Sequence, residues 1–199
     1  MSDSPNLERL PVLASTSPYR KLLLERIITD FDIHAPAVDE TPEINESAAE
    51  LVSRLALAKA AAIAAKYPAR LVIGADQSVS LDGDILVKPG SPQRAVEQLL
   101  AMSGQQLVFE TAVCVLCKDS GFRKLQVVPT RVRFRSLDKA AVVRYVAAEN
   151  PIDCVGGFKA EGLGIALFEA IESTDPTALI GLPLIATCQL LRSAGLRIP

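Results

Sequence analysis

Segments with a strand-like apolar pattern alternate with segments of helical pattern along this chain, and this alternation constrains the fold most. Alternating or continuous apolar runs predict strands over residues 10–14, 31–35, 71–81, 85–87, 107–116, 125–135 and 162–168. Helical spacing and capping residues predict helices over residues 17–28, 47–66, 92–102, 138–148 and 183–194. Asp82–Gly83 and residues 118–121 are typical of hairpin turns, so antiparallel strand pairs are expected. The sequence therefore predicts an α/β fold, a mixed sheet with flanking helices.

The composition predicts a folded domain with an aliphatic core. Of the 199 residues, 49% are hydrophobic but only 5% are aromatic, so Leu, Ile, Val and Ala must fill the core. The length favours one domain over residues 1–199, with residues 1–9 expected to form a flexible N-terminal extension. No uninterrupted apolar run could cross a bilayer and no secretory signal pattern is present, so we expect a cytoplasmic protein without a membrane partner. The net charge of −2 argues against a general nucleic-acid binder.

The chain has few residues that could form a redox-active cysteine pair or a site that depends on histidine. Cys114 and Cys117 form a CxxC string, but the surrounding apolar alternation predicts a strand that points the two thiols to opposite faces. We interpret both as buried structural residues rather than as a redox pair or half of a zinc site. His34 is the only histidine, which excludes a Ser-His-Asp triad and a metal site with two His ligands. Carboxylate and lysine chemistry remains, which suits Mg²⁺ or Mn²⁺ and phosphate substrates.

The loop after the first strand combines hydroxyl groups with cations. Ser17 is a good N-cap residue and Pro18 a good first helical residue. Arg20 and Lys21 fall in the first helical turn, where positive charge opposes the helix dipole and costs up to about 1 kcal/mol. A bound anion would reverse the sign of this effect, because it would meet free N–H groups, hydroxyls and a guanidinium together. The alternative is a solvated helix start with ordinary surface cations.

Two further charged residues fall on otherwise apolar elements. Lys59 lies on the apolar stripe of the helix over residues 47–66, so it either extends along its stem to solvent or reaches into a polar cleft. Asp76 follows an apolar strand start and needs a metal, a cation or water, unless it faces solvent at the strand end. Lys88 returns near Asp76 through the hairpin. Asp76 and Gln77 should face opposite sides of a regular strand, so a ligand that touches both requires a bulge.

Two loops complete the candidate site segments. Residues 156–162 hold glycines around Lys159 and Glu161, whose side chains would share one face of an extended segment. Such glycines suit a loop that approaches a ligand closely. Glu40 lies in the turn-like segment 38–42 and, taken alone, is simply a turn residue.

Together these motifs resemble those of the Maf family, in the family's order and over nearly the whole chain. They are Leu13–Arg20 (LASTSPYR), Val38–Glu40 (VDE), Arg54–Ala56 (RLA), Lys59–Ala60, Gly74–Gln77 (GADQ), Lys88–Pro89, Ser103–Gly104, Gly156–Gly162 (GGFKAEG) and Gly181–Leu184 (GLPL). The resemblance implies a fold related to inosine triphosphate pyrophosphatases, with an elongated mixed sheet and two lobes around a cleft. It also implies that a cytosolic enzyme hydrolyses a modified nucleoside triphosphate to the monophosphate and pyrophosphate, with a divalent cation.

The resemblance further implies roles for individual residues. Asp76 matches the family's proton acceptor, and Glu40 would bind the metal, Mg²⁺ or Mn²⁺, together with Asp76. The residues that would bind the substrate's phosphates are Ser15, Ser17, Arg20, Lys59 and Lys88.

Three specificity positions distinguish the branches of this family. Tyr19, Gln77 and Glu161 resemble those of the 7-methyl-GTP pyrophosphatase branch, which often has Trp at the first position and Ser in place of Gly157. The dTTP/UTP branch typically has Arg, Thr and Gln instead. Because 7-methylguanine carries a positive charge, an aromatic face attracts it and a carboxylate neutralises it. Tyr19 and Glu161 supply these two groups.

Two alternatives stay open for a chain with these motifs. One is a pyrophosphatase for dTTP, UTP or another nucleotide, and the other is a nucleotide-binding regulator of septum formation with little turnover. The resemblance also suggests a homodimer, which apolar surface on the helices would permit.

Overall fold

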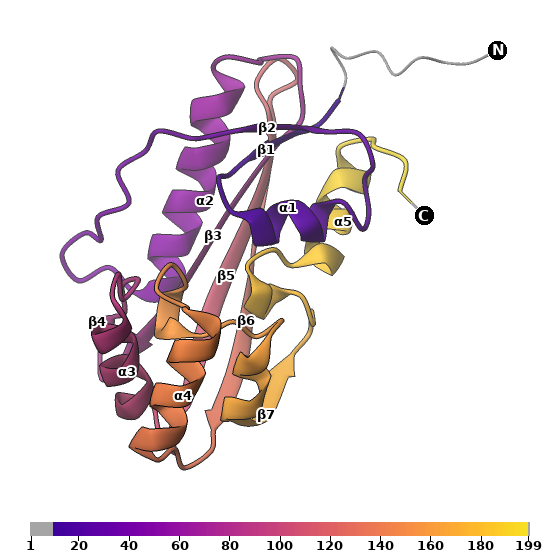
Figure 1. Ribbon diagram of the computed structural model, residues 1–199. Helices are drawn as coiled ribbons and strands as arrows, with labels where there is room; N and C mark the ends of the chain where they lie inside the picture. The colour runs from indigo at the N-terminus through magenta and orange to yellow at the C-terminus, as the bar shows by residue number, and fades with distance from the viewer. Residues whose placement is uncertain (1–9, 199) are drawn as a thin grey trace.

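The computed structural model describes residues 10–198, whose strands form one mixed sheet with helices on both faces (Figure 1). The strands are β1 (Val12–Ala14), β2 (Asp32–His34), β3 (Val72–Leu81), β4 (Asp84–Ile85), β5 (Gln106–Cys117), β6 (Phe122–Phe134) and β7 (Phe168–Ser173). Within the described residues their order is β2-β1-β3-β5-β6-β7, and β4 pairs with the end of β3. β1 runs parallel to β2 and β3, and the other pairs are antiparallel. The predicted mixed α/β architecture is confirmed, whereas the expectation for residues 1–9 lies outside the described residues.

A side chain caps the start of four of the five helices in the described part of the chain. The five helices are α1 (Pro18–Leu24), α2 (Ala48–Ala64), α3 (Pro92–Ala101), α4 (Lys139–Glu149) and α5 (Leu184–Ser193). Ser17 and Ser91 cap α1 and α3, and each is followed by a proline in the first turn. Ser47 and Glu50 form a capping box at the start of α2. Among the described residues, no helix has the length and apolar content that crossing a membrane would require.

Apolar clusters cover both faces of the sheet and both ends of its long strands. Figure 1 shows α2 on one side of β3 and β5, α1 and α5 on the other, and α3 and α4 towards the opposite end of the strands. The α2 cluster is built from small aliphatic residues such as Val52, Ala56 and Ile63. The cluster around α3 and α4 instead contains the rings of Phe109, Phe134 and Phe158. The two ends of the molecule therefore have separate cores joined by continuous strands.

The CxxC cysteines lie inside β5, as the apolar alternation predicts. Cys114 and Cys117 are both buried and both are free thiols. Burial raises the pKa of the Cys114 thiol to about 11, so it is protonated and unreactive at neutral pH. Their interpretation as structural core residues agrees with this placement.

The prediction of a strand over residues 162–168 is wrong. Residues Leu163–Leu167 form a 3₁₀ helix, η3, and the strand begins only at Phe168. The reason is that α4 binds this segment: the Glu149 carboxylate accepts a hydrogen bond from the Leu163 N–H (2.9 Å). Gly164 also packs on the Lys159 backbone so closely that a Cβ would lie 2.3 Å from its carbonyl oxygen. A strand would lose both contacts, and local sequence pattern carries no information about either.

Two other predicted elements are shorter in the structure. α1 ends at Leu24 rather than near Ile28, since the N–H groups of Arg26 and Ile27 bond three residues back in tight turns. β4 ends at Ile85, and the Gln98 side chain from α3 binds the carbonyl of Val87 (2.9 Å). The segment that carries Lys88 is thus held by α3 instead of by the sheet.

A single glycine permits the close approach of α2 to the sheet. A Cβ on Gly74 would lie 2.3 Å from the Ala56 carbonyl oxygen and 2.7 Å from the Ala60 nitrogen. Both atoms belong to the helix backbone, which cannot move aside as a flexible side chain would. Gly74 therefore sets the distance between α2 and β3, the two elements that carry Lys59 and Asp76.

We expect Gly74→Ala to lower the free energy of unfolding by about 3 kcal/mol, because overpacking against backbone forces a shift of the helix. Urea denaturation followed by circular dichroism measures this change. Gly121→Ala is the control: Gly121 has a φ of +68° but open space around it, so only the backbone cost of about 1 kcal/mol is expected. Equal losses for the two variants would contradict the steric explanation.

Candidate functional site

The candidate site lies where one edge of β3 has no strand partner. β1 pairs with β3 only over Val72–Gly74, and β4 pairs only with Ser80 and Leu81. In the part of the chain that the structure describes, the β3 edge is open over residues 75–78, before the Val79 carbonyl binds the Leu86 N–H, and it borders a cavity of about 610 Å³. This volume is typical of a pocket for a small molecule. The gap in the sheet therefore provides the space for a ligand.

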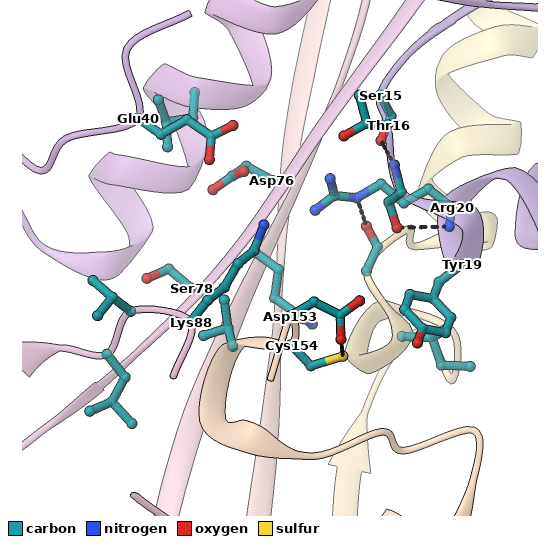
Figure 2. A pocket seen from close by; sticks show the side chains of 18 of the residues that line it. Ser15, Thr16, Tyr19, Arg20, Glu40, Asp76, Ser78, Lys88, Asp153 and Cys154 are labelled. Carbon is teal, nitrogen blue, oxygen red and sulfur yellow. Dashed lines mark hydrogen bonds between the residues drawn. The ribbon is translucent and has the colours of Figure 1, made fainter. Parts of the chain in front are cut away.

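All residues that the sequence analysis assigned to a site line this cavity. They are Ser15, Ser17, Tyr19, Arg20, Glu40, Lys59, Asp76, Gln77, Lys88 and Glu161. Figure 2 shows several of them converging from the loop after β1, from the segment before α2, from β3 and from the segment after β4. The structure thus brings them together, while their individual roles stay predictions.

Lys59 lies at the centre of a buried ion-pair cluster. Its Nζ lies 2.6 Å from Asp76 Oδ1 and 2.7 Å from Glu40 Oε1. Lys59 is 5% exposed and Asp76 is 7% exposed, whereas the Glu40 side chain is half exposed. Of the two alternatives for Lys59, the structure shows the one that reaches into a polar cleft. Burial acts to raise the pKa of Glu40, but the Lys59 hydrogen bond and charge outweigh burial and lower it.

The segment that carries Glu40 is fastened to α2 by an arginine. Arg54 donates from Nε to Glu46 Oε1 (2.6 Å) and from Nη2 to Glu46 Oε2 (2.7 Å), which is a bidentate pair. Its Nη2 also donates to the Thr41 carbonyl (3.1 Å), next to Glu40. The two Arg54 bonds to Glu46, together with the hydrogen bond that Glu46 Oε2 accepts from the Glu43 N–H (2.9 Å), lower the pKa of Glu46 to about 2. Arg54 therefore positions the Glu40 segment over the cavity.

The start of α1 presents a guanidinium to the cavity. Ser15 Oγ accepts a hydrogen bond from the Ser17 N–H, and Ser17 Oγ accepts one from the Arg20 N–H (Figure 2). Arg20 Nε donates to the Gly181 carbonyl (2.8 Å), which fixes the guanidinium and turns its terminal nitrogens into the cavity. Burial lowers the pKa of Arg20, although Asp76 and Glu40 act to raise it. This fixed, partly desolvated cation is suited to binding an anion.

Gln77 points away from Asp76, as a regular strand requires. The pairing of β3 with β5 runs without a bulge through both residues. Gln77 Nε2 donates to Thr111 Oγ1 (3.1 Å) and to the carbonyls of Ala178 (3.0 Å) and Leu179 (2.9 Å). These two carbonyls belong to η4 (Ala178–Ile180), the 3₁₀ helix that leads directly to Gly181. The amide nitrogen of Gln77 therefore holds the segment that anchors Arg20.

The glycine loop is folded against α4 instead of extended. Tyr145 Oη accepts a hydrogen bond from the Lys159 N–H (2.9 Å), and Lys159 Nζ donates to the Glu149 carbonyl (2.8 Å). Lys159 thus binds α4 and also hydrogen-bonds the Tyr19 side chain, while Glu161 lines the cavity. Because the segment is folded, the expectation of an extended segment with both side chains on one face is wrong. Burial raises the pKa of the Glu161 carboxyl, and Glu149 and Asp153 add to this effect.

The cavity also contains residues that the sequence analysis missed. Asp153 and Cys154 lie near Tyr19, and Ser78 lies on the wall formed by β3 (Figure 2). The sequence could have indicated Ser78, because this residue follows Asp76 by two positions and must share its face of the strand. Asp153 and Cys154 directly precede the glycine loop, but nothing in their spacing marks them. Burial raises the pKa of Cys154 to about 12, so its thiol is not activated.

The acidic residues of the site fit a metal only together with a ligand. Within residues 10–198 no group of three or more His, Cys, Asp or Glu side chains could hold a metal ion. Glu40 and Asp76 alone offer carboxylate oxygens on one side of the cavity. Mg²⁺ typically binds one or two carboxylates and completes its shell with substrate phosphates and water. The two carboxylates fit this mode and do not form a closed protein cage.

Comparisons with known proteins point to one family. The model of the Maf-like protein family matches residues 11–194. The chain is 46% identical to the 7-methyl-GTP pyrophosphatase of Albidiferax ferrireducens, over 98% of both chains. It is 52% identical to the protein of that name from Polaromonas sp., over 92% of this chain and 84% of the relative. A third such relative, from Pseudomonas aeruginosa, is 49% identical over 94% of this chain and 98% of its own.

The Arg54–Glu46 pair predicts an acid-dependent loss of stability. The pKa of Glu46 falls from an ordinary 4.5 to about 2 on folding, so ionised Glu46 stabilises the fold above pH 4.5. This contribution disappears as the pH falls from about 4.5 to about 2. We expect the urea midpoint of Glu46→Gln to decrease less over this range than that of the wild type.

Arg54→Met provides the matched control for this measurement. Because Arg54 is the largest cause of the shift, Glu46→Gln should change the pH dependence much less when Arg54 is already replaced, and the hydrogen bond from the Glu43 N–H accounts for the remaining effect. An equally large effect of Glu46→Gln with and without Arg54 would show that Arg54 is not the main cause of the lowered pKa.

Proposed function

The chain belongs to the Maf family, and from this premise we propose that it hydrolyses 7-methyl-GTP to 7-methyl-GMP and pyrophosphate. The observation that carries the proposal is the single cavity that Arg20, Lys59, Lys88 and Asp76 share. Its cations suit a triphosphate, and its buried aspartate suits the activation of water. We further propose that the chain acts as a single Maf-like domain in the cytoplasm. Exposed apolar side chains such as Leu22 would permit the homodimer that the family resemblance suggests.

The phosphates would bind to the cationic side of the cavity. Arg20 offers its terminal guanidinium nitrogens, which can bind phosphate oxygens in a bidentate manner. Lys88 has its ammonium group near the middle of the cavity (Figure 2). The hydroxyls of Ser15 and Ser17 accept backbone hydrogen bonds and can still donate their own protons to phosphate oxygens. These groups balance the charge of the substrate in a chain whose net charge is −2.

A divalent cation, Mg²⁺ or Mn²⁺, would be held by Glu40 and Asp76. Bound there, such an ion would neutralise part of the charge that develops on the phosphates during reaction. Lys59 lies between the same two carboxylates and keeps them together before a ligand arrives. Lys59 thus organises the acidic side of the site and adds positive charge beside the phosphates.

Asp76 is the proposed proton acceptor for the attacking water. Lys59 binds Asp76 Oδ1, and Oδ2 has no hydrogen-bond partner among the described residues. Oδ2 can therefore accept the proton of a water that attacks the α-phosphorus in line with the pyrophosphate leaving group. Burial of Asp76 and its contact with Lys59 keep its orientation fixed, which general base catalysis requires.

The base would bind beside the start of α1, between Tyr19 and Glu161. The charged ring of 7-methylguanine would stack on the Tyr19 ring, and the Glu161 carboxylate would accept its N–H groups. The clamp on the glycine loop by Tyr145 and Glu149 holds Glu161 in place for this contact. Gln77 would act on specificity through η4 and Arg20, because its amide nitrogen is bound to the η4 carbonyls.

Asp76→Asn should lower turnover about 10³-fold, because the variant cannot accept the proton of water. The fold should persist, since Lys59 keeps Glu40 as its partner. Chromatographic detection of 7-methyl-GMP and pyrophosphate, with Mg²⁺ or Mn²⁺, measures the rate. The control Asp82→Asn changes an exposed aspartate in the β3–β4 turn and should leave turnover intact. A wild-type rate for Asp76→Asn would exclude this residue as the proton acceptor. Formation of a nucleoside diphosphate instead of the monophosphate would contradict the proposed reaction.

Glu161→Gln should lower the ratio of kcat/KM for 7-methyl-GTP over GTP about tenfold, because it removes a charge-assisted contact. Since burial raises the pKa of Glu161, the wild-type ratio should also fall on acidification through that pKa, whereas the variant's ratio should not. Glu169→Gln, on the edge strand β7, is the control. An unchanged ratio would exclude Glu161 from base recognition. The same panel includes dTTP and UTP, and a preference for either would favour the alternative branch.

A further inference from the structure

One serine in the cavity wall has a hydroxyl without a hydrogen-bond partner among the described residues. Ser78 is 3% exposed and lines the cavity. Its Oγ makes no hydrogen bond to any described residue, and its cross-strand neighbour Glu110 does not bind it either. Gln98 Oε1 is the buried side-chain atom without a partner among the described residues, so the Ser78 hydroxyl is open to the cavity, where a bound ligand can accept its proton. Ser78 can therefore donate a hydrogen bond to an acceptor atom of a bound ligand.

The position of Ser78 indicates which part of the ligand would carry the acceptor atom. It lies on the same face of β3 as Asp76, and two residues along a strand are separated by about 7 Å. In Figure 2 Ser78 and Tyr19 lie on opposite sides of the cavity, with Asp76 and the Lys88 ammonium between them. A nucleotide with its base at Tyr19 and its α-phosphate at Asp76 would extend its remaining phosphates towards Ser78.

We propose that Ser78 donates a hydrogen bond to the terminal phosphate of the bound triphosphate, and hence to the departing pyrophosphate. This inference rests on the proposed function, which places the α-phosphorus beside Asp76. A neutral donor suits this place because Lys88 already supplies positive charge nearby, and the hydroxyl adds direction without more charge. Ser78 would thus distinguish a triphosphate from a monophosphate by contacting the part that only the former has.

The test compares the affinities for the two reaction products by isothermal titration calorimetry. Ser78→Ala should weaken the binding of inorganic pyrophosphate roughly tenfold, the loss expected for one hydrogen bond to a charged group. Its affinity for 7-methyl-GMP should stay unchanged. Ser80→Ala is the matched control: Ser80 lies on the same strand but is exposed outside the cavity, so both affinities should stay at wild-type values.

Thermal unfolding provides a second readout that needs no ligand. Ser78→Ala removes an unpaired hydroxyl, so it should unfold at a temperature no lower than the wild type. A marked decrease would show that the hydroxyl has a structural partner and would overturn the proposal. Unchanged pyrophosphate affinity, or equal weakening for both products, would overturn it as well. Weaker binding of Mn²⁺ alone would make Ser78 a metal ligand instead.

These outcomes separate the inference from the proposed function. If the wild type releases pyrophosphate from 7-methyl-GTP but Ser78→Ala binds pyrophosphate normally, the function stands and the inference is wrong. If the wild type does not hydrolyse 7-methyl-GTP but binds pyrophosphate through Ser78, the inference stands and the function is wrong. A wild type that neither hydrolyses 7-methyl-GTP nor binds pyrophosphate would reject both.

Discussion

The buried ammonium group of Lys59 is the contact on which the rest of the site depends. An isolated charge in this position would be costly, and its two carboxylate partners at 2.6 and 2.7 Å make it tolerable. Those partners come from β3 and from the segment before α2, so one cation joins three parts of the chain. Gly74 brings α2 close enough to β3 for this contact, and Arg54 holds the Glu40 segment above it.

The sheet topology explains why the cavity forms beside this cluster. β1 stops at Ala14 and β4 begins beyond Val79, which leaves the edge of β3 open between them. The chain that leaves β1 carries Arg20 over one end of the opening. The segment after β4 carries Lys88 over the other. Cations thus surround an aspartate on an element that the core holds rigidly, which is the arrangement that phosphate chemistry requires.

A second layer of residues holds the groups that line the cavity. Gln77 binds η4, and the residue after η4 anchors Arg20, so a side chain that points away from Asp76 still acts on the site. Tyr145 and Glu149 hold the loop of Glu161 in the same way from α4. The sequence analysis did not identify Tyr145 and Glu149, because each accepts a hydrogen bond from a backbone N–H of another segment. Side-chain patterns do not reveal such contacts.

The sequence by itself determined the alternation of strands and helices, the caps and the chemical character of the site, because periodicity, capping and charge are local properties. Lys59 on an apolar stripe and Asp76 after an apolar strand start already needed either partners or access to solvent. Only the tertiary structure decided which partners these are, since they depend on how segments far apart in the chain meet. It also decided that residues 163–167 coil against α4 and that the hydroxyl of Ser78 lines the cavity without an acceptor among the described residues. Both outcomes depend on long-range packing, which no local pattern encodes.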